Sequence, residues 1–392
     1  MKYFIIILAI CCIATGCATP SPVSVNKALL AKEEEELLWQ QAREEQAILD
    51  RSGWLFKDPE INSYLNEVAA RLKTHSISPE IPFEIKVIND PSLNAFAFPN
   101  GVIYVHTGLL ARMENEAQLA ALLAHEMTHC THRHTLRILV GLKKSPVGMA
   151  DAHRSEEQSA MLGDLRPILG VNGSISAVSG YTLEFEAEAD RVGLDLMTKA
   201  GYDSRQALNL FEHLRQEIVT EQIKEPYFFG THPVVQQRID NAQSWLAKNY
   251  AGEPAGSINQ KAFQARMDKL LLDNARLDLQ IGRFQSARKS AERYLHRHQN
   301  DAGAHYLLGE IFRQQARQTD TRAAMKHYQL AIELDPSFPA PYKAMGLMHY
   351  KEGQRLIAKK FFESCLLLSP DAPDRAYIQG YLKMCTNNGE ES

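Results

Sequence analysis

The chain reads HEMTH at residues 125–129, directly after a run that is rich in leucine and alanine. Four residues advance an α-helix by about 400°, so His125 and His129 lie about 40° apart on one face and can bind a single ion. Glu126 lies about 100° from His125, where its carboxylate can contact a water molecule instead of the ion. This spacing is typical of a zinc hydrolase, in which the metal activates water and a carboxylate accepts its proton.

Local sequence supports a helix at this position. The residues from Glu116 to Ala124 are strong helix formers. Within them, Leu119, Leu122 and Leu123 recur at helical spacing, which predicts one face pressed into a core. A chain with 14 histidines contains an HExxH pattern by chance in roughly a few per cent of cases. The interpretation therefore depends on finding a third ligand.

A later acidic segment, from Glu184 to Leu194, contains candidates for that ligand. A catalytic zinc ion has three protein ligands and one open position. Glu186 and Asp190 are four residues apart and share a helix face, so one can bind the metal while the other accepts the ring N–H of a zinc-bound histidine. The alternative is an ordinary solvated acidic face. Together with HEMTH, the segment predicts one Zn2+ per chain.

With these two segments the chain resembles metallopeptidase family forty-eight, a group of gluzincins. In that family the HExxH helix is followed by a helix that reads Glu-x-x-x-Asp, which Glu186 and Asp190 match in order and type. The resemblance implies that His125, His129 and Glu186 are the zinc ligands and that Glu126 is the catalytic base.

The segment from Asn94 to Leu110 resembles the part of the family that precedes the zinc helix. Asn100-Gly101 is a strong hairpin-turn dipeptide between two β-rich runs. We expect the following residues to form an edge strand that pairs with the backbone of a substrate, although an ordinary hairpin is also compatible. The strand residues concerned are Val102, Ile103, Tyr104 and Val105.

Further matches are Arg133-His134, after the zinc helix, and Thr231-His232-Pro233, followed by Arg238. The resemblance implies a place for His232 over the active site and for Arg238, with Asp190, beside the ligands. An imidazole there either stabilises the tetrahedral intermediate or binds zinc and holds the enzyme inactive, and both roles stay open. A lone His-Pro pair is usually only a turn.

Two other side chains next to the motif are expected to play no part in metal binding. Cys130 and His132 are interpreted as packing or surface residues, because the ligand set is already complete.

The N-terminus predicts secretion and lipidation. Lys2 precedes an apolar run from Tyr3 to Ile13 and then Ala-Thr-Gly-Cys, which ends at Cys17. This is the pattern of a signal peptide and is too short for a transmembrane helix. The end of the run resembles a bacterial lipobox, so we expect a signal peptide at 1–16, a lipid on Cys17 and a tether at 17–31. A plain signal peptide or a cysteine-rich anchor is the alternative.

Ala18 after the cysteine implies, by the sorting rule for such lipoproteins, the outer membrane of a Gram-negative bacterium, on its periplasmic side. The net charge of −4, from 43 basic and 47 acidic residues, gives no reason to expect nucleic acid as a partner. Six cysteines in 392 residues are too few for a disulfide framework. Cys365 and Cys385 either pair or remain free thiols.

The chain changes character near residue 255. We expect a mainly α, zincin-like domain with a small edge sheet at 32–250, of the α+β type, and a linker at 251–261. Within the domain, the segments predicted as elements are the helices Lys32–Asp50 and Pro59–His75 and the strand Phe83–Ile88. The Gly- and Ser-containing segment Leu142–Gly180 is interpreted as a cover for the cleft.

After the linker the sequence repeats. Gly309 and Gly346 each begin a pattern that continues with an alanine, an aromatic residue and a proline, and these later residues recur after 34 positions. That period is the signature of tetratricopeptide repeats, which form an α–α solenoid, expected here over 262–388 as about three repeats. A generic helical bundle is the alternative. The recurring residues are Ala324, Tyr328 and Pro336, then Ala358, Phe362 and Pro370.

Repeats of this kind present grooves for peptides or partner proteins. The combination resembles a periplasmic protease-chaperone of the family, associated with outer-membrane protein assembly. We therefore expect a membrane-anchored zinc endopeptidase that acts on misfolded or stalled envelope proteins and contacts the outer-membrane assembly machinery through the groove. The alternative is a non-proteolytic or autoinhibited assembly chaperone, against which the intact Glu126 argues.

Overall fold

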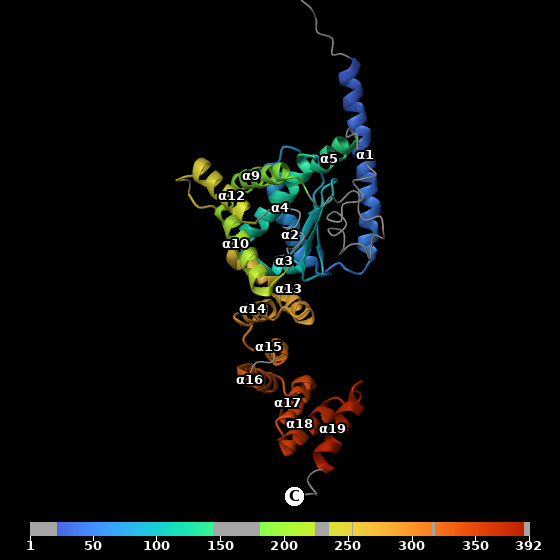
Figure 1. The fold of residues 1–392 in the computed structure, drawn as a ribbon, viewed down its shortest axis with the longest axis vertical. Helices are drawn as coiled ribbons and strands as arrows, with labels where there is room; N and C mark the ends of the chain where they lie inside the picture. Colours follow the sequence, from blue (N-terminus) through green and yellow to red (C-terminus); the bar gives the residue numbers. More distant parts are fainter. Residues whose placement is uncertain (1–21, 144–180, 224–234, 253, 316–317, 388–392) are drawn as a thin grey trace, which may run out of the picture.

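The computed structural model describes residues 22–143, 181–223, 235–252, 254–315 and 318–387. In these ranges a compact mixed α/β part leads into a column of helical hairpins that extends away from it (Figure 1). Three predicted features lie outside the described residues: Cys17 with the signal peptide, His232, and the cover segment from 144 onwards.

A small three-stranded sheet forms one side of the mixed part (Figure 1). Its strands are β1 (Glu84–Ile88), β2 (Ala95–Ala97) and β3 (Val102–His106). β2 and β3 form an antiparallel hairpin, and Gly101 in its turn has a φ of 95°, which glycine adopts without strain. β1 pairs with β3 in parallel, with Glu84 opposite Val102.

The strand β3 is therefore the central strand of the sheet, and the expectation that Val102 to Val105 form an edge strand is wrong. Every residue of β3 is buried, because β1 and β2 cover its two sides and helices cover its two faces, among them the helix Pro22–Arg51. Its continuous apolar run, from Val102 to Val105, is what a strand covered on both faces requires. Among the described strands, β2 lies at the edge next to β3.

Helix α4 (Glu116–Thr131) carries HEMTH and runs through the centre of the mixed part. Asn115 caps its start by accepting a hydrogen bond from the backbone N–H of Gln118, at 3.0 Å. It packs against α2, β2 and four later helices, and nearly all of its residues are buried. The helix ends where Arg133 adopts a left-handed φ of 53°, after which α5 (His134–Lys143) begins in a new direction.

Other helices surround α4. α1 (Pro22–Arg51) begins earlier than the predicted Lys32 and covers one face of the sheet (Figure 1). α2 (Pro59–Lys73) packs on β1 and α4, and α3 (Thr107–Arg112) directly follows β3. Beyond the undescribed segment 144–180, the chain continues with α9 (Leu183–Lys199), α10 (Arg205–Glu221) and α12 (Val235–Asn249). Of these, α9 makes the most extensive contact with α4.

Seven helices of the described residues after 259 form the repeats. Their bounds are α13 (Gln260–Gln280), α14 (Phe284–Leu295), α15 (Ala302–Gln315), α16 (Gln318–Leu334), α17 (Pro339–Lys351), α18 (Arg355–Leu368) and α19 (Arg375–Asn387). A Cβ on Gly309 would lie 2.4 Å from the ring of Tyr328, and one on Gly346 would lie 2.6 Å from the ring of Phe362. Each glycine thus lets an aromatic ring of the paired helix approach its backbone, which confirms the repeat predicted from the sequence.

The repeats are joined to the mixed part through α13, whose residues belong to two cores. Phe263, Met267 and Leu271 pack into the core of the mixed part, whereas Leu272 and Ala275 pack into the core of the repeats. No loop therefore separates the two cores. The predicted linker is itself partly anchored, since Ser257 bridges to the loop after α9.

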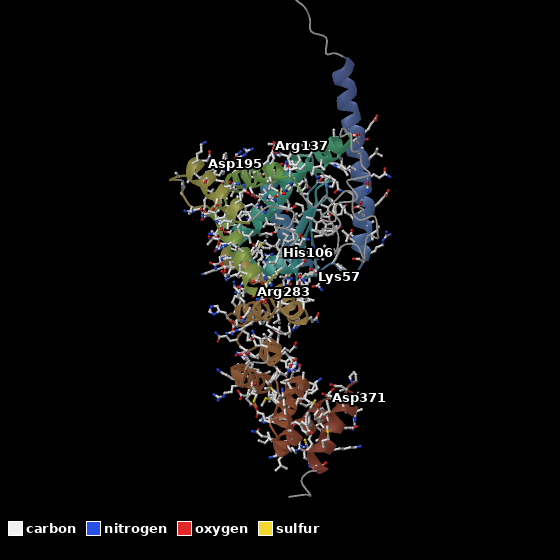
Figure 2. The ribbon with its side chains drawn as sticks, in the orientation of Figure 1. Lys57, His106, Arg137, Asp195, Arg283 and Asp371 are labelled. Carbon is white, nitrogen blue, oxygen red and sulfur yellow. The ribbon has the colours of Figure 1, made fainter. Side chains whose placement is uncertain are left out.

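A buried ion network reinforces this junction. The Arg112 guanidinium, on α3, donates two hydrogen bonds to Asp278 of α13 at 2.9 and 3.1 Å and one to Glu217 of α10 at 2.7 Å. Glu217 in turn accepts a short hydrogen bond from Ser286 of α14. Arg283, labelled at the junction in Figure 2, donates to the backbone oxygen of Pro91 at 2.7 Å.

The structure bears on two further predictions, which concern a membrane-spanning helix and a disulfide bond. Among the described helices, none is both long and apolar enough to cross a membrane. Cys130, Cys365 and Cys385 are buried free thiols in the described part of the chain, so Cys365 and Cys385 do not form a disulfide in this structure.

The carboxylate of Glu116 holds the start of α4 in place. It accepts hydrogen bonds from Tyr64 at 2.5 Å, Tyr202 at 2.9 Å and Asn259 at 2.7 Å, and it pairs with Arg71 at 2.8 Å. These partners come from α2, from the loop after α9 and from the segment that leads into α13. Burial acts to raise the pKa of Glu116, but these donors prevail and lower it.

Replacing Glu116 with Gln is expected to lower the free energy of unfolding by about 1–3 kcal/mol, because an ionised acceptor is lost among buried donors. Since the folded-state pKa is lowered, the ionised carboxylate stabilises the fold above the ordinary glutamate pKa, about 4, and this stabilisation disappears as the pH falls further. Denaturant unfolding should therefore show a difference between the two proteins at pH 7 that shrinks below pH 4. The exposed Glu67→Gln on α2 is the control, and equal stability of the Glu116 variant at pH 7 would contradict the prediction.

Candidate metal centre and active site

Three predicted ligands meet between α4 and α9. The Nε2 atoms of His125 and His129 are 3.0 Å apart. Oε2 of Glu186 lies 3.4 Å from Nε2 of His125, and Oε1 of Glu186 lies 3.6 Å from Nε2 of His129. All three side chains are buried, and one ligand atom from each forms a triangle whose sides are all within 4.8 Å.

This triangle fits a divalent metal ion. Ligand atoms about 2.1 Å from a tetrahedral zinc ion are about 3.4 Å from one another, which is close to the closest approach between each two of these side chains. Two imidazoles and one carboxylate are also a donor set of catalytic zinc sites, which keep a fourth position open. The three side chains can thus hold a metal ion without a large rearrangement.

The approach of α9 to α4 makes the triangle possible. A Cβ on Gly193, which lies two turns after Glu186 on α9, would be 3.1 Å from the backbone nitrogen of His125. Any larger residue at this position would press against the backbone of the ligand-bearing helix. Gly193 therefore lets the carboxylate of Glu186 reach both histidines.

Asp190 and Arg238 lie behind His125. Nδ1 of His125 is 3.0 Å from the Asp190 carboxylate, so its ring N–H can donate there and leave Nε2 as the nitrogen that faces Glu186. Arg238 of α12 donates two hydrogen bonds to the same carboxylate, at 2.5 and 2.9 Å. Burial acts to raise the pKa of Asp190, but Arg238 and His125 hold it at about 2.

The surroundings of His125 favour a positive charge. Burial and the nearby Arg238 act to lower the pKa of His125, but its hydrogen bonds with Asp190 and Glu186 prevail and raise it to about 9. Without a metal, a proton on the ring thus satisfies the carboxylates. A bound cation would satisfy the same carboxylates.

Glu126 is buried beside the ligands, as expected for a group that acts on a water molecule inside the site. Burial raises its pKa to about 7, and the negative charge of Glu186 adds to this effect while His125 and Arg238 oppose it. A carboxyl group with this pKa is suited to accept and return a proton near neutral pH.

A second set of side chains, on the far side of His129, was not predicted from the sequence. His134 contacts His129, and Glu188 contacts His134, with Nδ1–Nδ1 and Nε2–Oε2 distances of 2.8 and 3.2 Å. The ring of Tyr181 stacks on His129 at 3.8 Å. From the sequence, His134 was expected only as part of a family match. In an unbroken helix two residues five apart point to different faces, so the contact with His129 could be predicted only if the helix was known to break between them.

The remaining predicted residues are placed as follows. Cys130 packs under the hairpin, where its thiol donates to the backbone oxygen of Phe98 at 3.3 Å and burial raises its pKa. His132 is partly buried and contacts Glu188 at 2.8 Å. His232 lies outside the described residues.

Two family models match the chain. Residues 57–246 match "Peptidase family M48" and residues 272–339 match "Tetratricopeptide repeat". The first range contains the triangle of ligands, Glu126, Asp190 and Arg238. The second lies within the helical hairpins that follow α13.

Curated relatives share the first of these regions. The chain is 30% identical over 200 residues to the beta-barrel assembly-enhancing protease of Escherichia coli, and 32% identical over 197 residues to a putative protein of that name from Vibrio cholerae. Each match covers 48% of this chain and 40% of the relative. A mitochondrial metalloendopeptidase OMA1 of Schizosaccharomyces pombe is 31% identical over 184 residues, 47% of this chain and 52% of the relative. The matches thus span about half the length of these relatives or less.

Replacing Glu186 with Gln is expected to abolish stoichiometric binding of a divalent metal ion, because a neutral amide replaces the only carboxylate of the triangle. Elemental analysis of the purified, dialysed chain should give about one ion per unsubstituted chain and far less for the variant. Glu184→Gln, an exposed position on the same helix, is the matched control and should keep its ion. Full occupancy in the Glu186 variant would show that another residue is the third ligand.

Proposed function

Because residues 57–246 form a peptidase family M48 domain followed by tetratricopeptide repeats, we propose that the chain is a zinc-dependent endopeptidase that hydrolyses misfolded or stalled envelope proteins. The observation that carries this proposal is the buried triangle of His125, His129 and Glu186, with Glu126 beside it. A structural metal site would have no use for an additional buried carboxyl group whose pKa lies near neutrality.

Zinc bound by the triangle would act as a Lewis acid on the attacking water and on the carbonyl of the substrate. Glu126 would accept the proton of that water and then deliver it to the nitrogen of the departing amine. Asp190 and Arg238 would keep the ring of His125 in one orientation throughout, since both are held by hydrogen bonds with each other.

We further propose that the substrate backbone pairs with the outer edge of β2 and not with β3. Backbone hydrogen bonds join Phe98 to Val102 and Asn94 to His106. The backbone N–H and C=O groups of alternate residues from Asn94 to Phe98 therefore point toward β3. The N–H and C=O groups of Ala95 and Ala97 must then point away from β3. Helix α4 packs against β2, which brings this edge next to the helix that carries His125 and His129. Pairing through the backbone would let the enzyme accept many sequences.

The repeats supply the proposed binding module. Stacked helical hairpins form extended concave surfaces that bind peptides or partner proteins. Relatives of the peptidase region are called beta-barrel assembly-enhancing proteases. We propose that the repeats of this chain likewise bring the site to envelope proteins or to outer-membrane assembly machinery. We also propose that lipidated Cys17 anchors the chain to the outer membrane on the periplasmic side, on the strength of the N-terminal sequence.

Glu126→Gln is expected to lower the rate of proteolysis by about 10²–10⁴-fold, since a neutral amide cannot accept the proton, while the metal content stays the same. The assay follows cleavage of an unfolded β-rich outer-membrane protein on gels, with zinc measured in parallel. Glu184→Gln serves again as the control that keeps its activity. Undiminished cleavage by the Glu126 variant would rule out this residue as the base.

His232→Ala tests the role that the sequence leaves open for this imidazole. The same assay should show faster cleavage if His232 occupies the open position of the metal, and slower cleavage if it stabilises the transition state. Faster cleavage would further mean that the unsubstituted protein is held inactive until a partner or substrate displaces the imidazole. An unchanged rate would contradict both roles.

A further inference from the structure

A chain of hydrogen bonds leads away from the buried His129 to a partly exposed carboxylate. Its Nδ1 atom lies 2.8 Å from Nδ1 of His134, and Nε2 of His134 lies 3.2 Å from the carboxylate of Glu188. His134 is fully buried at the start of α5, and Glu188 is on α9, two residues after the ligand Glu186. The three side chains thus connect the end of α4 with α5 and α9.

The carboxylate determines where the protons lie along this chain. An ionised carboxylate only accepts hydrogen bonds, so Nε2 of His134 must carry the proton in its contact with Glu188. A neutral imidazole carries one ring proton, which leaves Nδ1 of His134 as an acceptor. Nδ1 of His129 must then be the donor, and Nε2 of His129, the atom in the ligand triangle, keeps its lone pair.

Aromatic rings hold the two imidazoles in this arrangement. Tyr181 stacks on His129 with a centroid distance of 3.8 Å, and Phe185 stacks on His134 at 4.5 Å. The guanidinium of Arg137 also lies over the ring of Phe185, at 4.2 Å from its centroid. Neither imidazole can rotate freely while these rings are packed on it.

The cluster of His132, His134 and Glu188 could also be regarded as a separate metal site, because its ligand atoms lie close together. Two observations oppose this. Arg137, labelled on α5 in Figure 2, already pairs with Glu188 at 3.0 Å. An ion on Nε2 of His134 would also move that ring's proton to Nδ1, which would then donate to Nδ1 of His129. His129 would have to carry its own proton on Nε2 and could not bind an ion with that atom. The cluster and the triangle therefore cannot both hold an ion.

We propose that His134 and Glu188 are positioning residues that fix the ring of His129 in the tautomer that binds the metal. This inference rests on the proposed function only in taking the triangle as a metal site. It gives His129 the support that Asp190 gives His125, except that a neutral imidazole stands between ligand and carboxylate. Both histidines of the triangle are thus oriented by carboxylates of α9, the helix that also supplies Glu186.

The test measures the zinc dissociation constant of the full chain by competition with a chromophoric chelator at constant pH. His134→Leu removes the acceptor and should weaken zinc binding about 10–100-fold. In His134→Asn the side-chain oxygen can occupy the position of Nδ1, so binding should stay close to that of the unsubstituted chain. Glu188→Gln removes the charge that orients His134 and should fall between these two. Glu184→Gln is the control.

Two further readouts separate positioning from packing. The metal-free thermal unfolding midpoint of each variant shows whether it is folded; if His134→Leu does not fold, Glu188→Gln carries the test. The visible spectrum of the cobalt-substituted chain reports the geometry of the ligands, and it should change in His134→Leu but not in His134→Asn.

The proposal is overturned if His134→Leu binds zinc as tightly as the unsubstituted chain, or if His134→Asn weakens binding as much as His134→Leu does. It is also overturned if the unsubstituted chain binds two zinc ions at saturation. Loss of proteolysis plays no part in these outcomes. A chain that shows the expected order of zinc affinities but cleaves nothing would refute the proposed endopeptidase and leave the positioning role standing.

Discussion

The close approach of α9 to α4 is the contact on which the candidate site depends. Gly193 brings the two backbones so near that a single added methyl group would touch the backbone of His125. Because of this approach, a carboxylate from one helix reaches two imidazoles of the other, and the three ligand atoms converge before any ion is added. The two ends of α4 are fixed independently: Glu116 gathers four donors at its start, and Arg133, with a left-handed φ, stops the helix from continuing past its end. The site is therefore preorganised by packing that lies outside it.

Charges around the site are organised in two pairs, one buried and one partly exposed. Asp190 is matched by Arg238 and Glu188 by Arg137, and each of these carboxylates also holds a histidine. A buried ion pair adds little to stability by itself, because desolvation offsets most of the attraction between the charges. The pairs fix direction, because each arginine holds a carboxylate that accepts the ring proton of a histidine. The same helix that supplies the candidate ligand Glu186 thus also determines the orientation of both imidazoles.

Periodic features could be predicted from the sequence, and features that depend on distant pairing could not. The spacing of His125 and His129, the pairing of Glu186 with Asp190, and the recurrence of Gly309 and Gly346 all follow from helix geometry within one segment or repeat. The central position of β3 could not be predicted, because it depends on parallel pairing with β1. The contact between His134 and His129 depends on a helix break at Arg133, which no strong breaker such as proline or glycine marks. The boundary near residue 255 is visible in composition, but the packing of α13 into both cores is not.

That shared helix has a mechanical consequence. Because Leu271 and Leu272 are neighbours on α13 but belong to different cores, the repeats of the second core cannot swing relative to the mixed part unless α13 unfolds or leaves one core. The separation between the first helical hairpins of the repeats and the ligand triangle is therefore nearly constant. An extended polypeptide spans at most about 3.3–3.6 Å per residue. A polypeptide bound to these hairpins would reach the triangle only with residues beyond a minimum length, so the junction would act as a molecular ruler for a segment that the repeats present.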